Sequence, residues 1–585
     1  MAGSLCEGVL PLKTNLIYAG VGGAIAYAWV VSASVIYCIA VGHQEGFVFP
    51  FVQWVQVLPS WDANWFVKVC IIASAAFPSA VVYLVAWTCW QNREKLRRQP
   101  LTGKLRPVER GVSLIHGDAH FATPAECLKR YHGPAGVVIG ELITGGLGTG
   151  KLVIDTIGTG AGHGMLVAGT RSGKTTSAVT GLLHWPGSAV TLDPSAEMGG
   201  MLREALEANG KRVFLLHPER ANSGFNALDW IDPSQPLASM AVKEVISWVF
   251  PESSKDVKTD GYFEPTGRAL CLAILADLIW SDRPSSEKTL KTFRNLVVTP
   301  EIKMPKLLES IHAHSNSRMA RDIAGTLMRI TPKQWSGVYG QATQGTEWLS
   351  EPELADLVSG NSFRTVDILD GRTFVFAQVP LHALEQSPGV GRVIIGTLMH
   401  AIYDAAARGE VSERVLVELD EAWVLGPMKI QKSTLVAGAK SGIVLNFLYQ
   451  SVGQIKEIWG ENGSITLYNN LEWRAYAATK DRQTSEDISS EIGEISVLAR
   501  SEGHNSGRQR PGGLRWGSRS SGDNTSVQEI KRRLVLPQEI RNAPRDEMFV
   551  IAGDMNMRLR MPRYFNRPDL VRIVKPSHYY RRAAE

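Results

Sequence analysis

A glycine-rich segment carries the residues with the clearest chemistry. The apolar run Gly164–Ala168 is followed by Gly-Thr-Arg-Ser-Gly-Lys-Thr-Thr at residues 169–176. A strand, a glycine-rich turn and a helix in this order form a P-loop, whose backbone amides bind phosphate. We expect Lys174 to reach the β- and γ-phosphate oxygens of ATP and the Thr175 hydroxyl to bind Mg²⁺. The predicted nucleotide-binding residues are Gly169, Thr170, Arg171, Ser172, Gly173, Lys174, Thr175 and Thr176.

A second apolar segment ends in two neighbouring carboxylates, Asp420 and Glu421. This pattern is typical of a Walker B strand, in which one acid orients Mg²⁺ and the next polarises the attacking water. We assign Asp420 to the metal and Glu421 to the water. An Asp-Glu pair also occurs where a surface strand leads into a helix cap. The P-loop in the same chain favours the ATP site.

A third apolar segment, Ile443–Tyr449, ends in Gln450. In RecA-like motors a polar residue at the tip of the strand beside Walker B senses the γ-phosphate. We therefore group Gln450 with Lys174 and Glu421 as the predicted catalytic residues.

The elements that must position these residues alternate between strands and helices, which predicts an α/β fold with a core parallel sheet. We expect a RecA-like P-loop nucleotide-binding domain in two parts, residues 136–235 and 361–570. Between them, residues 236–360 show helical periodicity almost throughout and predict an inserted all-α domain. A helical cap with no separate role is the alternative.

The N-terminal region contains two long uncharged runs, each exceeding the ~20 apolar residues that span a bilayer. We expect two transmembrane helices rather than a buried helical hairpin. Arg93, Lys95, Arg97 and Arg98 follow the second run, whereas the intervening loop carries only Lys68 as a cation. The positive flank predicts that both termini are cytoplasmic. The predicted regions are an N-terminus at 1–15, spans at 16–42 and 69–90, a periplasmic loop at 43–68, a basic stalk and linker at 91–135, and a C-terminal tail at 571–585.

Composition sets outer limits on the function. The 585 residues are 44% hydrophobic and 20% charged, which is the composition of a folded protein, and the net charge of +5 does not by itself indicate nucleic acid. Six scattered cysteines exclude a disulfide scaffold. No LSGGQ-like signature precedes Walker B and no His-Glu-x-x-His occurs, which disfavours an ABC transporter and a membrane AAA protease.

Motifs along most of the chain resemble those of the type IV secretion coupling proteins, the TraG/TraD/TrwB-like family within the FtsK/HerA group of P-loop ATPases. The matching segments are Gly117–Ala122, His163, the P-loop, Ala189–Pro194, Gly224–Asp229, Leu419–Trp423, Gln450–Gly460, Asn469–Asn470, Ala478–Asp481, Arg533–Glu539 and Arg563–Phe565.

The resemblance implies a membrane-bound coupling ATPase of the bacterial inner membrane that uses ATP and Mg²⁺. Such a homo-hexamer recruits a relaxase with single-stranded DNA to a type IV secretion system and helps to translocate it, as in conjugation. Its implied partners are the other inner-membrane components and ATPases of the system, single- or double-stranded DNA, and membrane lipid. Two alternatives stay open: a coupling ATPase for protein effectors without DNA, and a nucleotide-gated membrane receptor or scaffold.

The chain departs from the family pattern in two places. Ser195 follows Asp-Pro where the family usually has Lys, and Gly438-Ala-Lys-Ser-Gly442 replaces a Gly-Arg-Gly-Tyr-Gly segment. The arginine expected to reach a neighbouring subunit's nucleotide is thus missing, and Lys440 and Arg474 are the candidates for this role in trans.

A stretch rich in Gly, Ser and Arg occupies residues 502–523. Its composition predicts a flexible loop, and contact of its arginines with a nucleic-acid backbone is the alternative.

Overall fold

The computed structural model describes residues 110–577 apart from 112, 114, 145–149, 157–160, 251–261 and 509–518, together with residues 31, 65, 68, 69, 72, 76, 79, 83 and 579. The chain divides into two units, Met1–Val108 and Glu109–Glu585. The spans predicted at 16–42 and 69–90 lie outside the described residues except for isolated positions. Among the residues that are described, no helix combines the length and apolar character needed to cross a membrane.

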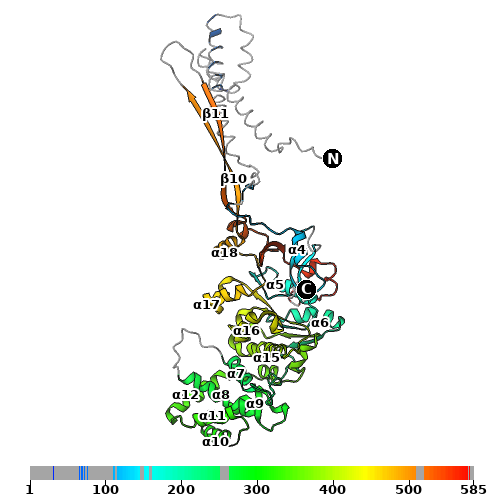
Figure 1. Cartoon of the computed structure of the whole chain (residues 1–585), viewed down its shortest axis with the longest axis vertical. Coiled ribbons are helices and arrows are strands. Elements are labelled where there is room, and N and C mark those ends of the chain that lie inside the picture. The colour runs from blue at the N-terminus through cyan, green and yellow to red at the C-terminus, as the bar shows by residue number, and fades with distance from the viewer. Residues whose placement is uncertain are drawn as a thin grey trace, which may run out of the picture. The chain divides into compact units, whose positions relative to one another are not determined.

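The second unit is built on an 11-stranded mixed sheet (Figure 1). Its strands follow the order β2-β1-β13-β12-β9-β3-β8-β7-β4-β6-β5, and the neighbours from β9 to β5 are parallel. The prediction of a parallel core is confirmed for that part, but β12, β13, β1 and β2 extend it with antiparallel pairs. The strands are β1 Gly136–Leu142, β2 Leu152–Thr156, β3 Gly164–Ala168, β4 Ala189–Leu192, β5 Arg212–Leu216, β6 Thr373–Ala377, β7 Val415–Asp420, β8 Ile443–Tyr449, β9 Trp473–Ala477, β12 Glu547–Ala552 and β13 Met555–Arg560.

Helices cover both faces of the sheet, because alternate side chains of the parallel strands enter two different cores. In β3, Leu166 and Ala168 belong to the core under α5 and α6, whereas Met165 and Val167 belong to the core on the other face. The first face is covered by α4 Pro124–Arg130, α5 Lys174–His184 and α6 Met198–Ala208. The second is covered by α15 Pro388–Ala407, α16 Lys429–Ala437, α17 Val452–Asn469 and α18 Arg482–Ile492.

In the connection from β5 to its parallel neighbour β6, the regular elements among the described residues are helices, joined by turns and loops. Its buried residues, such as Leu275 and Phe293, join the core that also contains strand residues Val417 and Phe447. The region therefore packs continuously against the nucleotide-binding part. Its helices are α7 Ala238–Val249, α8 Phe263–Trp280, α9 Leu290–Val297, α10 Met304–His314, α11 Arg318–Leu327, α12 Pro332–Gly345 and α13 Pro352–Leu357, followed after β6 by α14 Leu381–Gln386 (Figure 1).

The flexible loop predicted for residues 502–523 is wrong for much of its length. The strands β10 Glu494–Arg508 and β11 Arg519–Arg533 form a long antiparallel ribbon, followed by α19 Pro537–Arg541. Its base is fixed by hydrogen bonds from Gly111 N to Ser496 O at 2.9 Å and from Ala119 N to Glu494 O at 3.1 Å. Backbone pairing satisfies the peptide groups whatever the side chains are, so a composition typical of loops did not exclude strands.

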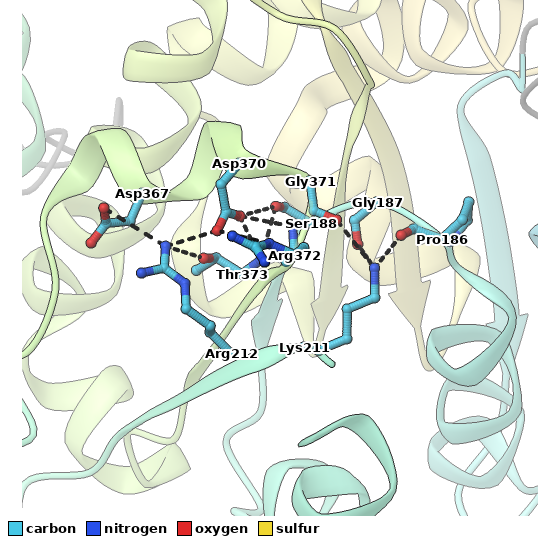
Figure 2. Close-up of polar contacts among 10 residues, drawn as sticks. All are labelled: Pro186, Gly187, Ser188, Lys211, Arg212, Asp367, Asp370, Gly371, Arg372 and Thr373. Carbon is cyan, nitrogen blue, oxygen red and sulfur yellow. Dashed lines mark hydrogen bonds and ion pairs between the residues drawn. The ribbon is translucent and has the colours of Figure 1, made fainter. Parts of the chain in front are cut away.

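The end of the sheet opposite the P-loop is held by two cations at the start of β5 (Figure 2). Lys211 Nζ donates to the carbonyl oxygens of Pro186, Gly187 and Gly371, and burial lowers the pKa of this ammonium. Arg212 forms an ion pair of 2.8 Å with Asp370. These contacts tie the beginnings of β4, β5 and β6 together at the amino ends of the parallel strands.

Candidate nucleotide-binding site

The turn between β3 and α5 has the backbone conformation of a P-loop. Arg171 and Gly173 have φ angles of 61° and 108°, both in the left-handed region. A Cβ atom at residue 173 would lie 3.0 Å from Thr176 Oγ1 and 3.1 Å from Met561 Sδ, so only glycine fits without displacement. The first amides of α5 have no intrahelical acceptors and face the turn, as an anion site requires.

Three side chains from three separate elements converge beside this turn. Lys174 Nζ lies 3.0 Å from Glu421 Oε1, and the Gln450 amide donates to the same oxygen at 2.9 Å. Lys174 and Glu421 are largely buried, with side chains 9% and 15% exposed. The structure therefore brings together the predicted catalytic residues of the P-loop, of Walker B and of the neighbouring strand.

Glu421 is held in place from both sides. Its backbone adopts φ 53°, a left-handed conformation that is uncommon for glutamate. Its other carboxylate oxygen, Oε2, accepts a hydrogen bond of 2.9 Å from Trp423 Nε1. Because both oxygens accept hydrogen bonds, the carboxylate is fixed in position beside the P-loop lysine.

Asp420 lies at the tip of β7, 5% exposed. Burial raises the pKa of Asp420 to about 7, Lys174 lowers it, and Glu421 and Asp193 raise it. Asp193 follows the neighbouring strand β4 and accepts hydrogen bonds from Glu197 N, Gly199 N and Gln378 Nε2. Sequence reasoning noted Asp193 only as part of a motif and missed its place beside Walker B.

The surplus of carboxylates over ammonium groups suits a divalent cation. No group of three or more His, Cys, Asp or Glu side chains within the described residues is arranged to hold a metal by itself. Mg²⁺ usually takes only one or two protein carboxylates, together with phosphate oxygens and water. The donor set thus fits Mg²⁺ bound through Asp420 and Thr175 together with phosphate.

Ser172 and Thr176 complete the loop. Thr176 Oγ1 donates to Gly173 O at 2.7 Å, which closes the turn. The Ser172 hydroxyl is buried, and its oxygen has no hydrogen-bond partner in the described part of the chain. Thr175 is partly buried at the second position of α5. This arrangement leaves polar groups of the loop available to a phosphate.

Arg563, from the segment after β13, is a contributor that sequence reasoning missed. Its Nη2 donates to the Ser172 carbonyl oxygen at 3.1 Å, and its Nε would lie 3.3 Å from a Cβ at residue 173. Thr180 Oγ1 of α5 donates to Pro562 O at 3.5 Å, which seats the same segment on the helix. The only signal in the sequence was that Arg563–Phe565 matched a family motif.

The two candidates for a residue acting in trans have different surroundings. Arg474 on β9 has a side chain only 16% exposed and forms an ion pair with Glu491 of its own chain. Its guanidinium also lies 5.3 Å from the centre of the Tyr468 ring. Lys440 is exposed in a short 3₁₀ turn, Gly438–Ser441, directly before β8.

Comparison with known proteins agrees with this geometry. Residues 126–582 match the family of type IV secretory system proteins of conjugative DNA transfer. The chain belongs to this family of coupling proteins. The conjugal transfer protein TraG of Agrobacterium fabrum is 32% identical over 495 residues, covering 80% of this chain and 73% of that protein. The type IV secretion system coupling protein VirD4 of Bartonella quintana is 31% identical over 508 residues, covering 82% and 77%.

Solved structures of a coupling protein share the fold. The conjugative coupling protein TrwBdeltaN70 superposes with a TM-score of 0.53 and 18% identity over 78% of this chain and 96% of its own. TrwB in complex with ADP and Mg²⁺ gives the same TM-score at 17% identity, over 79% and 96%. At such identities the likeness shows the fold alone, a nucleotide-binding α/β fold with a mixed sheet.

Arg563→Gln should raise the KM for ATP several-fold and change kcat less. The guanidinium of Arg563 donates to the Ser172 carbonyl and places a positive charge behind the phosphate-binding turn, and the substitution removes both. Steady-state ATPase kinetics of the full chain would measure this split. Arg563→Lys should restore part of the affinity, and Arg572→Gln, an exposed change in the same segment, is the control. An unchanged KM in Arg563→Gln would remove this residue from the site.

Glu421→Gln should bind ATP with nearly wild-type affinity and hydrolyse it at least ~10²-fold more slowly, because the amide keeps the shape but cannot accept a proton. Asp420→Asn should instead weaken Mg²⁺-dependent nucleotide binding. Titration with a fluorescent ATP analogue at several Mg²⁺ concentrations, together with turnover, separates the two effects. Equal losses of nucleotide affinity in both variants would contradict this division of roles.

Proposed function

We propose that this chain is an ATP-hydrolysing motor that recruits a relaxase bound to single-stranded DNA to a type IV secretion system and helps to translocate it. The observation that carries the proposal is the convergence of Lys174, Glu421 and Gln450 at the P-loop. A site that only binds nucleotide without hydrolysing it would need Lys174, but it would not need the carboxylate of Glu421 fixed by Lys174, Gln450 and Trp423. Membership of the conjugative coupling proteins supports the choice of substrate.

The contact between Lys174 and Glu421 suggests how hydrolysis is controlled. When the ammonium turns to the β- and γ-phosphate oxygens, Glu421 loses its cationic partner and becomes a stronger proton acceptor for the attacking water. Gln450 stays hydrogen-bonded to Glu421, so it can sense when the γ-phosphate is lost. Asp420 and Thr175 would hold Mg²⁺, which would compensate the charge of the phosphates.

We further propose that the chain works as a homo-hexamer with each ATP site between two subunits. Lys440 is the better candidate for the residue acting in trans, because it is exposed whereas Arg474 is committed to Glu491 within its own chain. A lysine gives a point charge rather than the forked contact of an arginine.

The proposed domains have the bounds predicted from the sequence. Residues 236–360 form an all-α domain within the nucleotide-binding domain (136–235 and 361–570), and a C-terminal tail covers 571–585. The region before residue 110 anchors the chain in the bacterial inner membrane through spans at 16–42 and 69–90, with both termini in the cytoplasm. Other inner-membrane components and ATPases of the secretion system, and membrane lipid, are its neighbours there.

The full-length chain in detergent should hydrolyse ATP, and single-stranded DNA should increase kcat several-fold, because a motor couples turnover to its substrate. Lys174→Ala should abolish both basal and stimulated activity, since the ammonium is the main charge facing the phosphates. An ATPase that responds to a purified effector protein but not to DNA would favour a coupling ATPase for effectors. Nucleotide binding without hydrolysis would favour a receptor or scaffold.

Mixing two inactive variants tests the residue acting in trans. Lys440→Ala and Lys174→Ala should each be inactive alone, but mixed rings contain interfaces with Lys174 from one subunit and Lys440 from the next. Turnover should therefore reappear on mixing. Arg474→Gln mixed with Lys174→Ala is the matched control. Arg474→Gln alone should keep turnover; if it is instead inactive and regains turnover with Lys174→Ala, while Lys440→Ala alone stays active, the role belongs to Arg474.

A further inference from the structure

A row of polar residues crosses the buried face of the sheet beneath α5. The register places Gly164 of β3 beside Trp473 of β9 on one side and Asn446 of β8 on the other. Asn446 in turn lies beside Glu418 of β7, and Glu418 beside Thr191 of β4. Their strand neighbours on the same face are apolar, including Leu166, Leu416 and Leu448 in the α5 core.

The polar atoms of this row are buried and only partly paired. Trp473 is 2% exposed, Glu418 2%, Asn446 8% and Thr191 0%. A single hydrogen bond joins them, from Asn446 Nδ2 to Glu418 Oε2 at 2.7 Å. Trp473 Nε1, Asn446 Oδ1, Glu418 Oε1 and Thr191 Oγ1 have no hydrogen-bond partner in the part of the chain described. Buried polar atoms are nearly always satisfied, so this row needs a further partner.

A small cavity lies where three of these residues meet. Its volume is 20 Å³, and Trp473, Asn446 and Glu418 line it together with residues of β1 and α5. The helix contributes Ser177, Ala178 and Gly181, which are too small to fill the space. About 10–15 Å³ of such space is enough for one water molecule.

Glycine at residue 164 keeps the row open. A Cβ there would lie 2.1 Å from the indole ring of Trp473, so any larger residue would displace the ring from the sheet. The indole of Trp473 therefore lies against β3 at the position where other residues would carry a Cβ atom. Trp473, Asn446 and Glu418, which carry the unpaired indole N–H and the unpaired oxygens, all line the same cavity.

We propose that this cavity is an internal binding site for one ordered water molecule beneath the P-loop helix. A water molecule there accepts one hydrogen bond from Trp473 Nε1, donates one to Asn446 Oδ1 and makes a third with Glu418 Oε1. It thereby satisfies three of the four unpaired atoms, and a typical buried water makes about three such bonds. A metal cation is a poor fit for this cavity, because the indole N–H of Trp473 directs a partial positive charge into it.

The site lies close to the catalytic edge without belonging to it. Glu418 is two residues before Asp420 on the same face of β7, and Asn446 lies on β8, four residues before Gln450. The water would join the Walker B strand, the neighbouring strand and β9 through one set of hydrogen bonds. The inference does not depend on what the motor transports.

The deciding experiment is a structure of the full chain at a resolution that shows ordered water. A density peak within hydrogen-bond distance of Glu418 and of either Asn446 or Trp473 is the expected result. A dry cavity, or a direct contact between Trp473 Nε1 and Glu418 Oε1 that closes it, would overturn the proposal.

Thermal unfolding provides an independent test. Asn446→Leu should lower the Tm by several degrees, because it removes the partner of Glu418 and expels the water. The double variant Glu418→Leu/Asn446→Leu should recover much of that loss, since no buried carboxylate remains to be satisfied. Glu418→Gln is the matched control and should stay near the wild-type Tm with the water retained in its structure. A double variant as unstable as Asn446→Leu, with no water in the wild-type structure, would refute the site.

Discussion

The position of one ammonium group among several carboxylates determines how the site is organised. Lys174 is the cation that faces Glu421 and lowers the pKa of Asp420, while Asp193 adds a further negative charge from the next strand. These acids can lie so close together because the ammonium offsets their repulsion in a buried place. In the proposed mechanism the same lysine binds the phosphates of ATP, so nucleotide binding would also release Glu421 from its cationic partner.

The sheet places these charges by the simplest rule of a parallel α/β fold, that the carboxyl ends of the strands meet at one edge. The Lys211 and Arg212 contacts fix the other end of β4, β5 and β6, so the strands cannot slide independently. Within the sheet, β7 and β8 are linked twice, by Asn446 with Glu418 in the core and by Gln450 with Glu421 at the edge. These two side-chain links add to the backbone pairing of β7 with β8.

Much of this could be predicted because the decisive signals are local. The P-loop spacing, the Asp-Glu pair after an apolar run, and the strand Ile443–Tyr449 need only a few consecutive residues, and each was found where expected. The antiparallel extension was missed because β13, Met-Asn-Met-Arg-Leu-Arg, is a short segment whose apolar residues only alternate with polar ones, and its partners β1 and β12 lie far apart in the chain. Part of the ribbon β10–β11 was read as a loop because residues 502–523 are rich in Gly, Ser and Arg.

The roles of Asp193 and Arg563 could not be predicted, because they depend on contacts between distant parts of the chain. Asp193 comes beside Asp420 only when β4 pairs with β7. Arg563 contacts the P-loop although it lies 391 residues after Ser172 in the chain. No periodicity or motif chemistry encodes such a distance. The polar row beneath α5 is of the same kind, since its members come from five strands.

The strand order has a consequence for synthesis on the ribosome. Strand β1 pairs with β2 and β13, and β13 reaches the rest of the sheet through β12, so an early strand is joined to the parallel core by late ones. During translation the P-loop emerges long before its support from Arg563. In a nascent chain β1 can pair with β2 at once, but this pair is joined to the parallel strands only after β12 and β13 have emerged. The hydrogen bond from Arg563 to the Ser172 carbonyl can therefore form only after nearly the whole chain has been synthesised.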